Sequence, residues 1–151
     1  MQGGCGSRPT ASDADRQGVR PAAVAAVDAA LHAAGLDPHR PAPGEWGVAL
    51  PCAGRPLHVG IAVRAGLVEA RAEVLGSAAA DPAWLLHRNR RALRVVRYAT
   101  SAAGDVWVHG DLPAAGLTAA AVDELLGRLV EAADAARSYA SSPSAAIVRS
   151  R

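Results

Sequence analysis

The chain has 151 residues, about one domain's worth, and half of them are hydrophobic, which is enough for a core. Phenylalanine is absent and alanine supplies much of the hydrophobic count, so the core has to rest on valine, leucine, isoleucine and a few tryptophans and tyrosines. The net charge of +2, from 16 basic and 14 acidic residues, is too small for a protein that wraps duplex nucleic acid.

The cysteines and the apolar segments bear on the compartment. No apolar run approaches the roughly 20 residues that span a bilayer, and the N-terminal residues lack the basic start and apolar centre of a signal peptide. The two cysteines, Cys5 and Cys52, make a poor disulfide framework because Cys5 falls in a predicted tail. We therefore expect a cytoplasmic protein without a membrane anchor.

Both ends of the chain differ from the middle in composition. Residues 1–19 are rich in Gly, Ser, Asp and Arg without an apolar period, which predicts a disordered tail. Residues 141–151 are expected to form a second, flexible tail. The globular domain is therefore predicted to span residues 20–140. It opens with a helix over residues 21–34, which has Pro21 at its first position and Gly35 as its stop.

After a proline-broken connector the apolar period changes from helical spacing to two. Residues 46–50, 57–63 and 67–75 alternate apolar with small or polar side chains, as half-buried strands do. The short links between them indicate antiparallel neighbours in a meander.

The second half repeats the two kinds of pattern. A short helix is predicted from Pro82 to Arg91 with Asp81 as its cap, followed by a strand from Leu93 that places Val96 and Tyr98 on one face. The "VWVHG" segment returns as a fifth strand, and the last helix begins after Thr118. The order is α-β-β-β-α-β-β-α, which predicts an α+β fold: an antiparallel five-stranded sheet with helices packed on one face.

The sequence offers no reaction centre. The five histidines lack close metal-ligand spacing, Cys52 has no cysteine or histidine at a useful spacing, and no Ser-His-acid or paired-carboxylate arrangement stands out. We therefore predict a protein that is not an enzyme, with no catalytic residue, no metal site and no cofactor.

The segment "PAWLLHRNRRALRVVRYAT" contains five of the chain's arginines, Arg88, Arg90, Arg91, Arg94 and Arg97. A nucleic-acid reader usually adds stacking aromatic side chains, and only Trp84 and Tyr98 are near. The favoured interpretation is a solvated rim along an edge strand, where charge discourages edge pairing. The alternative is a site in the 88–97 cluster for nucleic acid, the less favoured partner, or for another acidic ligand.

The same segment, together with the hairpin and the helix after it, resembles the YbjN family, in particular its actinobacterial branch described as type III secretion chaperone-like. The resemblance covers roughly residues 22–140. It rests on an aromatic-Leu-Leu-x-x-Asn helix, a Gly-Asp hairpin, an acidic-Leu-Pro link and a final helix with a Thr start and an acidic-x-Leu-Leu run. The corresponding residues are Trp84, Leu85, Leu86 and Asn89; Gly104 and Asp105; Asp111, Leu112 and Pro113; and Thr118, Asp123, Leu125 and Leu126.

The resemblance implies a secretion-chaperone-like fold that holds an extended segment of a partner protein, usually as a dimer, with no catalytic residues to carry over. The chain would then be a small chaperone or regulatory adaptor that binds a protein partner. The resemblance is also compatible with a homodimer. Apolar rows on the second and third strands are one candidate surface, although for any single residue in them a place in the core is the favoured interpretation, and the arginines are another. The candidate partner-binding residues are Val59, Ile61, Val68, Val74, Arg90, Arg94 and Arg97.

Overall fold

The computed structural model describes residues 11–142, and for residues 11–19 it describes the backbone alone. Three helices and five strands follow one another in the predicted order, and their bounds are α1 (Ala11–Ala33), β1 (Glu45–Leu50), β2 (Leu57–Arg64), β3 (Leu67–Leu75), α2 (Pro82–Arg91), β4 (Val96–Thr100), β5 (Val106–Pro113) and α3 (Ala119–Ala140). The predicted fold class, an α+β arrangement of one antiparallel sheet and helices, is confirmed.

The five strands form one antiparallel sheet in the order β1-β2-β3-β5-β4. The first three strands make the predicted meander, and β4 and β5 make the predicted hairpin. The last strand, β5, lies between β3 and β4, so that β1 and β4 are the two edges of the sheet. The tight turn between β2 and β3 is made by Ala65 and Gly66, both with positive φ angles as this kind of hairpin requires.

Strict alternation divides the sheet into an inner and an outer face. On β2, Leu57, Val59, Ile61 and Val63 are buried, while His58, Gly60 and Arg64 are exposed. Successive side chains of a strand point to opposite faces, so the buried set meets the helices and the other set meets solvent.

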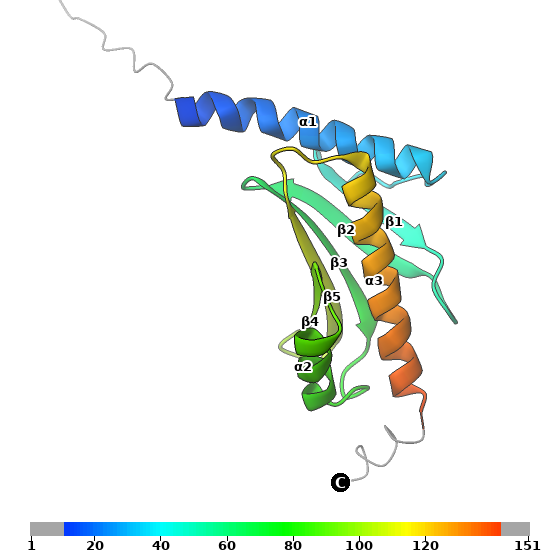
Figure 1. Cartoon of the computed structure of the whole chain (residues 1–151). Helices are drawn as coiled ribbons and strands as arrows, with labels where there is room; N and C mark the ends of the chain where they lie inside the picture. Colours follow the sequence, from blue (N-terminus) through cyan, green and yellow to red (C-terminus); the bar gives the residue numbers. More distant parts are fainter. Residues whose placement is uncertain (1–10, 143–151) are drawn as a thin grey trace, which may run out of the picture.

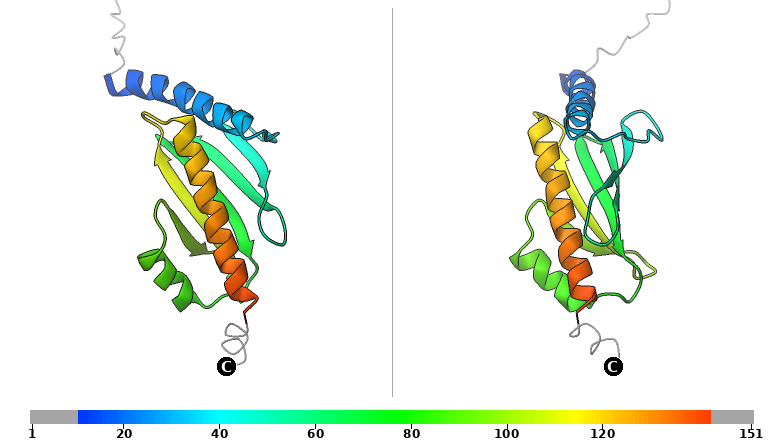
Figure 2. Two further views of the ribbon diagram at one scale, coloured as in Figure 1. Left: turned by 45° about the vertical axis from the view of Figure 1, so that its right-hand side comes forward. Right: turned by 90° about the vertical axis from the view of Figure 1, so that its right-hand side faces the viewer.

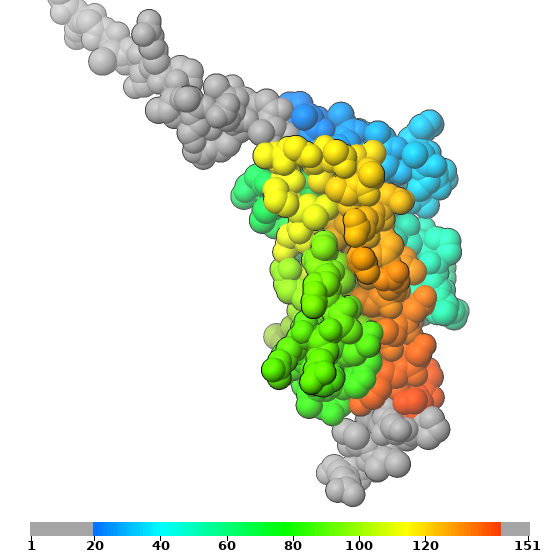
Figure 3. All heavy atoms as spheres, viewed as in Figure 1, coloured from blue at the N-terminus to red at the C-terminus, as the bar shows by residue number. Residues whose placement is uncertain are grey.

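All three helices lie on the inner face (Figures 1 and 2). α3 makes the most extensive contact with the sheet, which it crosses over β3, β5 and β4, and α1 crosses the end of α3 (Figure 1). The shorter α2 joins this layer through its Trp84 ring, which stacks on Tyr139 of α3 with centroids 4.2 Å apart. In the space-filling view α2 and α3 together hide most of the sheet (Figure 3).

Small residues bring α3 close to the sheet. Gly110 of β5 is buried, and a β-carbon built on it would lie 2.4 Å from Leu125 Cδ1 and 2.9 Å from Val96 Cγ1. Leu125 and the fully buried Ala132, Ala133 and Ala136 form the face that α3 turns to the core. The Tyr98 hydroxyl donates a 2.6 Å hydrogen bond to the Ala132 carbonyl, which ties β4 to the same helix.

Two predicted boundaries are wrong. α1 begins at Ala11 and continues through Pro21. An interior proline removes one backbone hydrogen bond, at a cost of about 3 kcal/mol, but it does not prevent the helix from forming. The predicted tail of residues 1–19 thus has a helical backbone from Ala11, and residues 1–10 lie outside the described part, as do residues 143–151 of the other predicted tail. β4 begins at Val96 instead of Leu93, because Val95 has a φ of +68° that breaks the extended backbone.

Replacing Gly110 with alanine tests the close approach of α3. The added methyl group has to displace Leu125 and Val96, so we expect the Gly110→Ala protein to lose about 1–3 kcal/mol of its free energy of unfolding. Urea denaturation followed by circular dichroism measures this. Gly60→Ala is the matched control, since the nearest atom to its β-carbon is 4.0 Å away. Equal midpoints for the two variants would show that α3 has room to move.

Candidate partner-binding site

The face of the sheet without helices is crossed by one row of residues in register. Pairing places Gly47 beside Gly60, Gly60 beside Arg71, Arg71 beside His109, and His109 beside Arg97. The row therefore changes along its length, from bare backbone on β1 and β2 to cationic side chains on β3 and β4. We call this helix-free surface the open face.

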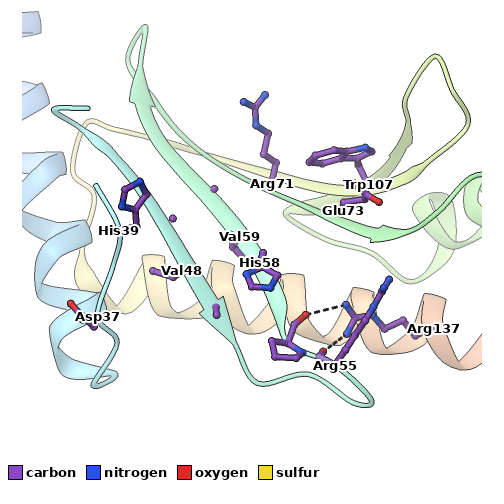
Figure 4. A pocket seen from close by; sticks show the side chains of 14 residues that line it. Asp37, His39, Val48, Arg55, His58, Val59, Arg71, Glu73, Trp107 and Arg137 are labelled. Atoms are coloured by element: carbon purple, nitrogen blue, oxygen red, sulfur yellow. Dashed lines mark hydrogen bonds between the residues drawn. The ribbon is translucent and has the colours of Figure 1, made fainter. Parts of the chain in front are cut away.

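The open face is hollowed into a groove with a volume of about 930 Å³, here called the sheet groove. Figure 4 shows the side chains that line it, which come from three places: the open face itself, the connector before β1, and the end of the molecule where β2 begins. Its lining side chains include Asp37, His39, Ala49, Arg55, Pro56, His58, Arg71, Glu73, Trp107 and Arg137.

The connector between α1 and β1 forms one wall of the groove. His39 pairs with Gly47 as an isolated antiparallel bridge, with N···O distances of 2.9 and 2.8 Å, and so covers part of the outer edge of β1. Asp28 of α1 fixes this wall from below. Its carboxylate accepts a 2.8 Å hydrogen bond from the indole N–H of buried Trp46 and pairs with Arg40 of the connector.

Two arginines form the end of the groove near the start of β2. Arg137 of α3 donates a 2.7 Å hydrogen bond to the Arg55 carbonyl, with longer contacts to neighbouring carbonyls (Figure 4). Arg55 in turn donates a 2.9 Å bond to the Val74 carbonyl. Both guanidinium groups are thus oriented by neutral acceptors, and Arg137 also interacts with the charge of Asp134.

The adjacent turn is fastened to α3 by Asp134. Its carboxylate accepts hydrogen bonds from the Cys52 thiol at 3.0 Å and from the Ala53 amide at 2.9 Å, and these bonds lower its pKa. Burial, and next the bond to Asp134, raise the pKa of Cys52. The thiol therefore stays protonated at neutral pH, which makes it a weak nucleophile and gives it a structural part.

The floor of the groove is low because it lacks side chains. Gly47 and Gly60 face each other on β1 and β2, and neither has a positive φ angle. These glycines therefore matter because they leave open space above the sheet. The nearest atom to a β-carbon built on Gly47 is His39 Cβ, and for Gly60 it is the Arg71 carbonyl oxygen, each at 4.0 Å. Half-buried Trp107 adds apolar surface on the opposite wall.

Charge on the open face is unevenly paired. Arg97 forms a 2.7 Å ion pair with Asp111, whereas no carboxylate of the described residues lies within ion-pair distance of Arg71. Partial burial, followed by the charges of Arg97 and Arg71, lowers the pKa of His109, which lies between them. His109 is therefore neutral near pH 7, and the positive charge of this part of the face comes from the arginines.

A second, smaller hollow of about 220 Å³ continues the groove along β2. It shares Gly47, Gly60 and Arg71 with the first, and it adds Glu45, Glu69 and Arg64. Glu45 is already paired with Arg64. The two hollows together follow β2 from its beginning to its end, a track of the length that an extended chain would occupy.

The four apolar residues predicted to bind a partner lie in the core. Val59 and Ile61 are 2% exposed, and Val68 and Val74 are fully buried. Their side chains point to the inner face, beneath the helices. Val59 borders the sheet groove and Ile61 borders the smaller hollow, but each contributes little exposed surface there. Burial of these side chains argues against them as the main partner contacts, because most side chains that line the groove belong to the outer half of each strand or to the loops.

The five clustered arginines do not form one patch. Arg88 packs its guanidinium over the Trp84 ring at 5.7 Å, Arg90 and Arg91 are exposed at the end of α2, and Arg94 bonds to the carbonyl of its own neighbour. Arg97 lies on the open face. The edge-strand position predicted for Arg97 is confirmed, since β4 is an edge of the sheet.

A metal centre and a membrane span are two further features that a chain of this size could contain. Within the described part of the chain, no three His, Cys, Asp or Glu side chains are grouped as metal ligands. None of the described helices is long and apolar enough to cross a membrane.

The sequence interpretation missed Arg55, Arg71, Trp107 and Arg137 as groove residues, although the alternation of β3 and β5 places Arg71 and Trp107 opposite the core.

Comparisons with known proteins place the fold. No family model and no curated protein matches the chain. The type III secretion chaperone SycH of Yersinia pestis, solved with a fragment of YscM2, aligns with a TM-score of 0.57 over 74% of this chain and 96% of that one, at 14% identity. The ExoT–SpcS complex of Pseudomonas aeruginosa contributes a match with a TM-score of 0.55 over 76% and 97%, at 16% identity. For the ExsC–ExsE complex the TM-score is 0.58 over 76% and 90%, at 17% identity.

These structures establish that the chain has the fold of type III secretion chaperones over about three quarters of its length. The secretion-chaperone-like fold predicted from the sequence is thereby confirmed. At such low identities the match concerns the fold alone, and function has to be argued from the residues of the site.

Replacing Asp28 with alanine tests how the wall of the groove is held. The change leaves the buried Trp46 N–H without an acceptor, so we expect a loss of about 1–3 kcal/mol in the free energy of unfolding. Asp28→Asn keeps an acceptor oxygen and should lose less. Urea titration of both proteins, with exposed Asp123→Ala as the control, gives the comparison. If Asp28→Ala behaves like the control, the wall does not depend on this bond.

Proposed function

We propose that the chain is a non-enzymatic, chaperone-like or adaptor protein that binds an extended segment of a partner protein in the sheet groove. The observation that carries this proposal is that no helix of residues 11–142 covers the open face, which is hollowed along β2. Surface grooves are common binding sites for segments of partner proteins. The structural neighbours support it further, since SycH is a secretion chaperone solved in complex with a fragment of another protein.

The finer parts of the proposal rest on the sequence resemblance. We place the chain with the YbjN family and its actinobacterial chaperone-like branch, and we propose that it acts in the cytoplasm. The resemblance leaves open whether it is a chaperone or a regulatory adaptor. The groove is consistent with either, because both hold a segment without changing its chemistry.

Site-specific photo-crosslinking tests where the partner binds. A benzoylphenylalanine placed at Ala49, in the groove, should capture a partner from a native lysate, whereas the same residue at exposed Ala120 of α3 should not. The captured product should persist after nuclease treatment. Capture at Ala120 alone would move the site to the helical face. A crosslinked product that disappears after nuclease treatment would favour nucleic-acid binding. The Arg90→Ala/Arg91→Ala double variant would then show whether the arginines of residues 88–97 are responsible.

We also propose that two copies pair at the β4 edge. β4 has one strand neighbour, and two of the three exposed large hydrophobic side chains of the described residues, Leu86 and Val95, lie on α2 and next to β4. Leu86 is 67% exposed and Val95 is 46% exposed, and a second copy at this edge would bury both apolar side chains.

Light scattering coupled to gel filtration measures the assembly. We expect the mass of a dimer for the wild type and of a monomer for Leu86→Glu. Leu67→Glu, which changes the third exposed hydrophobic residue at the turn between β2 and β3, is the matched control and should remain dimeric. A monomeric wild type would disprove the pairing without affecting the groove.

A further inference from the structure

The sheet groove contains three arginines, and no carboxylate of the described residues lies within ion-pair distance of any of them. Arg55 and Arg137 are oriented by backbone carbonyls, and Arg71 meets no carboxylate of the described residues at ion-pair distance. We propose that the groove selects partner segments with acidic side chains, and that Arg71 and Arg55 are the residues that bind them. This inference rests on the proposed function, since it assumes that a partner segment lies in the groove.

Placement favours Arg71 as the main contact. Its register neighbours are Gly60 on β2 and His109 on β5, so on the β2 side no side chain rises beside it. A segment lying over the two glycines would therefore have its backbone close to the sheet and its carboxylates within reach of this guanidinium. The planar guanidinium can bind a carboxylate through two parallel hydrogen bonds.

Arg55 offers a second cation at the end of the groove. Its bond to the Val74 carbonyl uses one nitrogen, which leaves further N–H groups for a ligand. Arg137 is better regarded as support, because it already makes several bonds to carbonyls and lies near the charge of Asp134. His58, exposed on β2, lines the groove as well and can donate a hydrogen bond.

Two carboxylates in the lining limit how acidic the ligand can be. Glu73 lies beside Trp107 and Asp37 lies at the connector wall, apart from Arg55 and Arg137 (Figure 4). Both carboxylates would repel a chain with a negative charge at every unit, such as a nucleic acid. The groove instead suits a protein segment with a few acidic residues next to apolar or small ones, the apolar side chains resting against Trp107.

An array of short fluorescein-labelled peptides supplies the probe. One series alternates aspartate with serine, proline or leucine, and two matched series have asparagine or lysine in place of aspartate. Fluorescence anisotropy with the full-length protein should show binding by the aspartate series, weaker binding by asparagine and none by lysine. Affinity should fall as salt is raised, because exposed charges are screened.

Three variants assign the binding to the groove. Arg71→Ala should weaken the aspartate peptides by about fivefold, the size expected for one exposed ion pair. Gly60→Val should abolish binding by filling the floor, and it should keep the fold, since valine favours strands and the nearest atom to the built β-carbon is 4.0 Å away. Ala99→Val, exposed on the open face outside both hollows, should bind like the wild type.

The outcomes separate this inference from the proposed function. Equal binding of the aspartate and asparagine series, lost in Gly60→Val, would keep the groove as a segment site and overturn its acid selectivity. An unchanged affinity in Arg71→Ala would overturn the assignment of that residue. If aspartate peptides still bind Gly60→Val, both the inference and the proposed groove site are overturned. The same holds if a single-stranded oligonucleotide displaces these peptides from the wild type and from Gly60→Val alike. Failure of every peptide to bind would overturn the acid selectivity, and photo-crosslinking would then decide the groove.

Discussion

The close approach of α3 to the sheet at Gly110 is the constraint on which the other contacts depend. A chain without phenylalanine and rich in alanine fills its core by bringing backbones together, because small side chains cannot bridge a wide gap. Leu125 occupies the space that a side chain at Gly110 would take, and the alanines of α3 continue the contact. This packing sets the spacing at which α2 stacks on α3 and α1 crosses it.

Because the inner face takes all three helices, the apolar half of every strand is used up in the core. The outer half has few large apolar side chains, among them Trp107 and Leu67, so it can stay in contact with water with little loss of stability. The depth of the groove is what makes this face a candidate site. Two glycines leave its floor without side chains, while the connector held by Asp28 and the end held by Arg137 form its walls. The groove is thus a consequence of where the chain lacks side chains as much as of where it has them.

The sequence predicted local structure well because the signals for it are local. Alternation identified the strands, and caps such as Asp81 and Thr118 marked the starts of α2 and α3, where the structure has them. It could not show that β5 enters between β3 and β4, since that depends on contacts far apart in the chain. The alternation favoured burial of the apolar half of each strand but could not show that the outer half would be hollowed, and the candidate site was therefore assigned to the core valines and Ile61 instead of to Arg71 and the glycines.

The arginines show the same separation between sequence and space. Those between Arg88 and Arg97 are neighbours along the chain, yet the turn at Val95 and the change from helix to strand send them in different directions. Arg55, Arg71 and Arg137 are far apart in sequence, yet sheet pairing and the C-terminal half of α3 bring them to one groove. An exposed charge contributes little by itself, and its effect depends on whether a neighbouring carboxylate has already neutralised it. On this measure Arg97, paired with Asp111, is the weaker candidate for a ligand, and Arg71 is the stronger one.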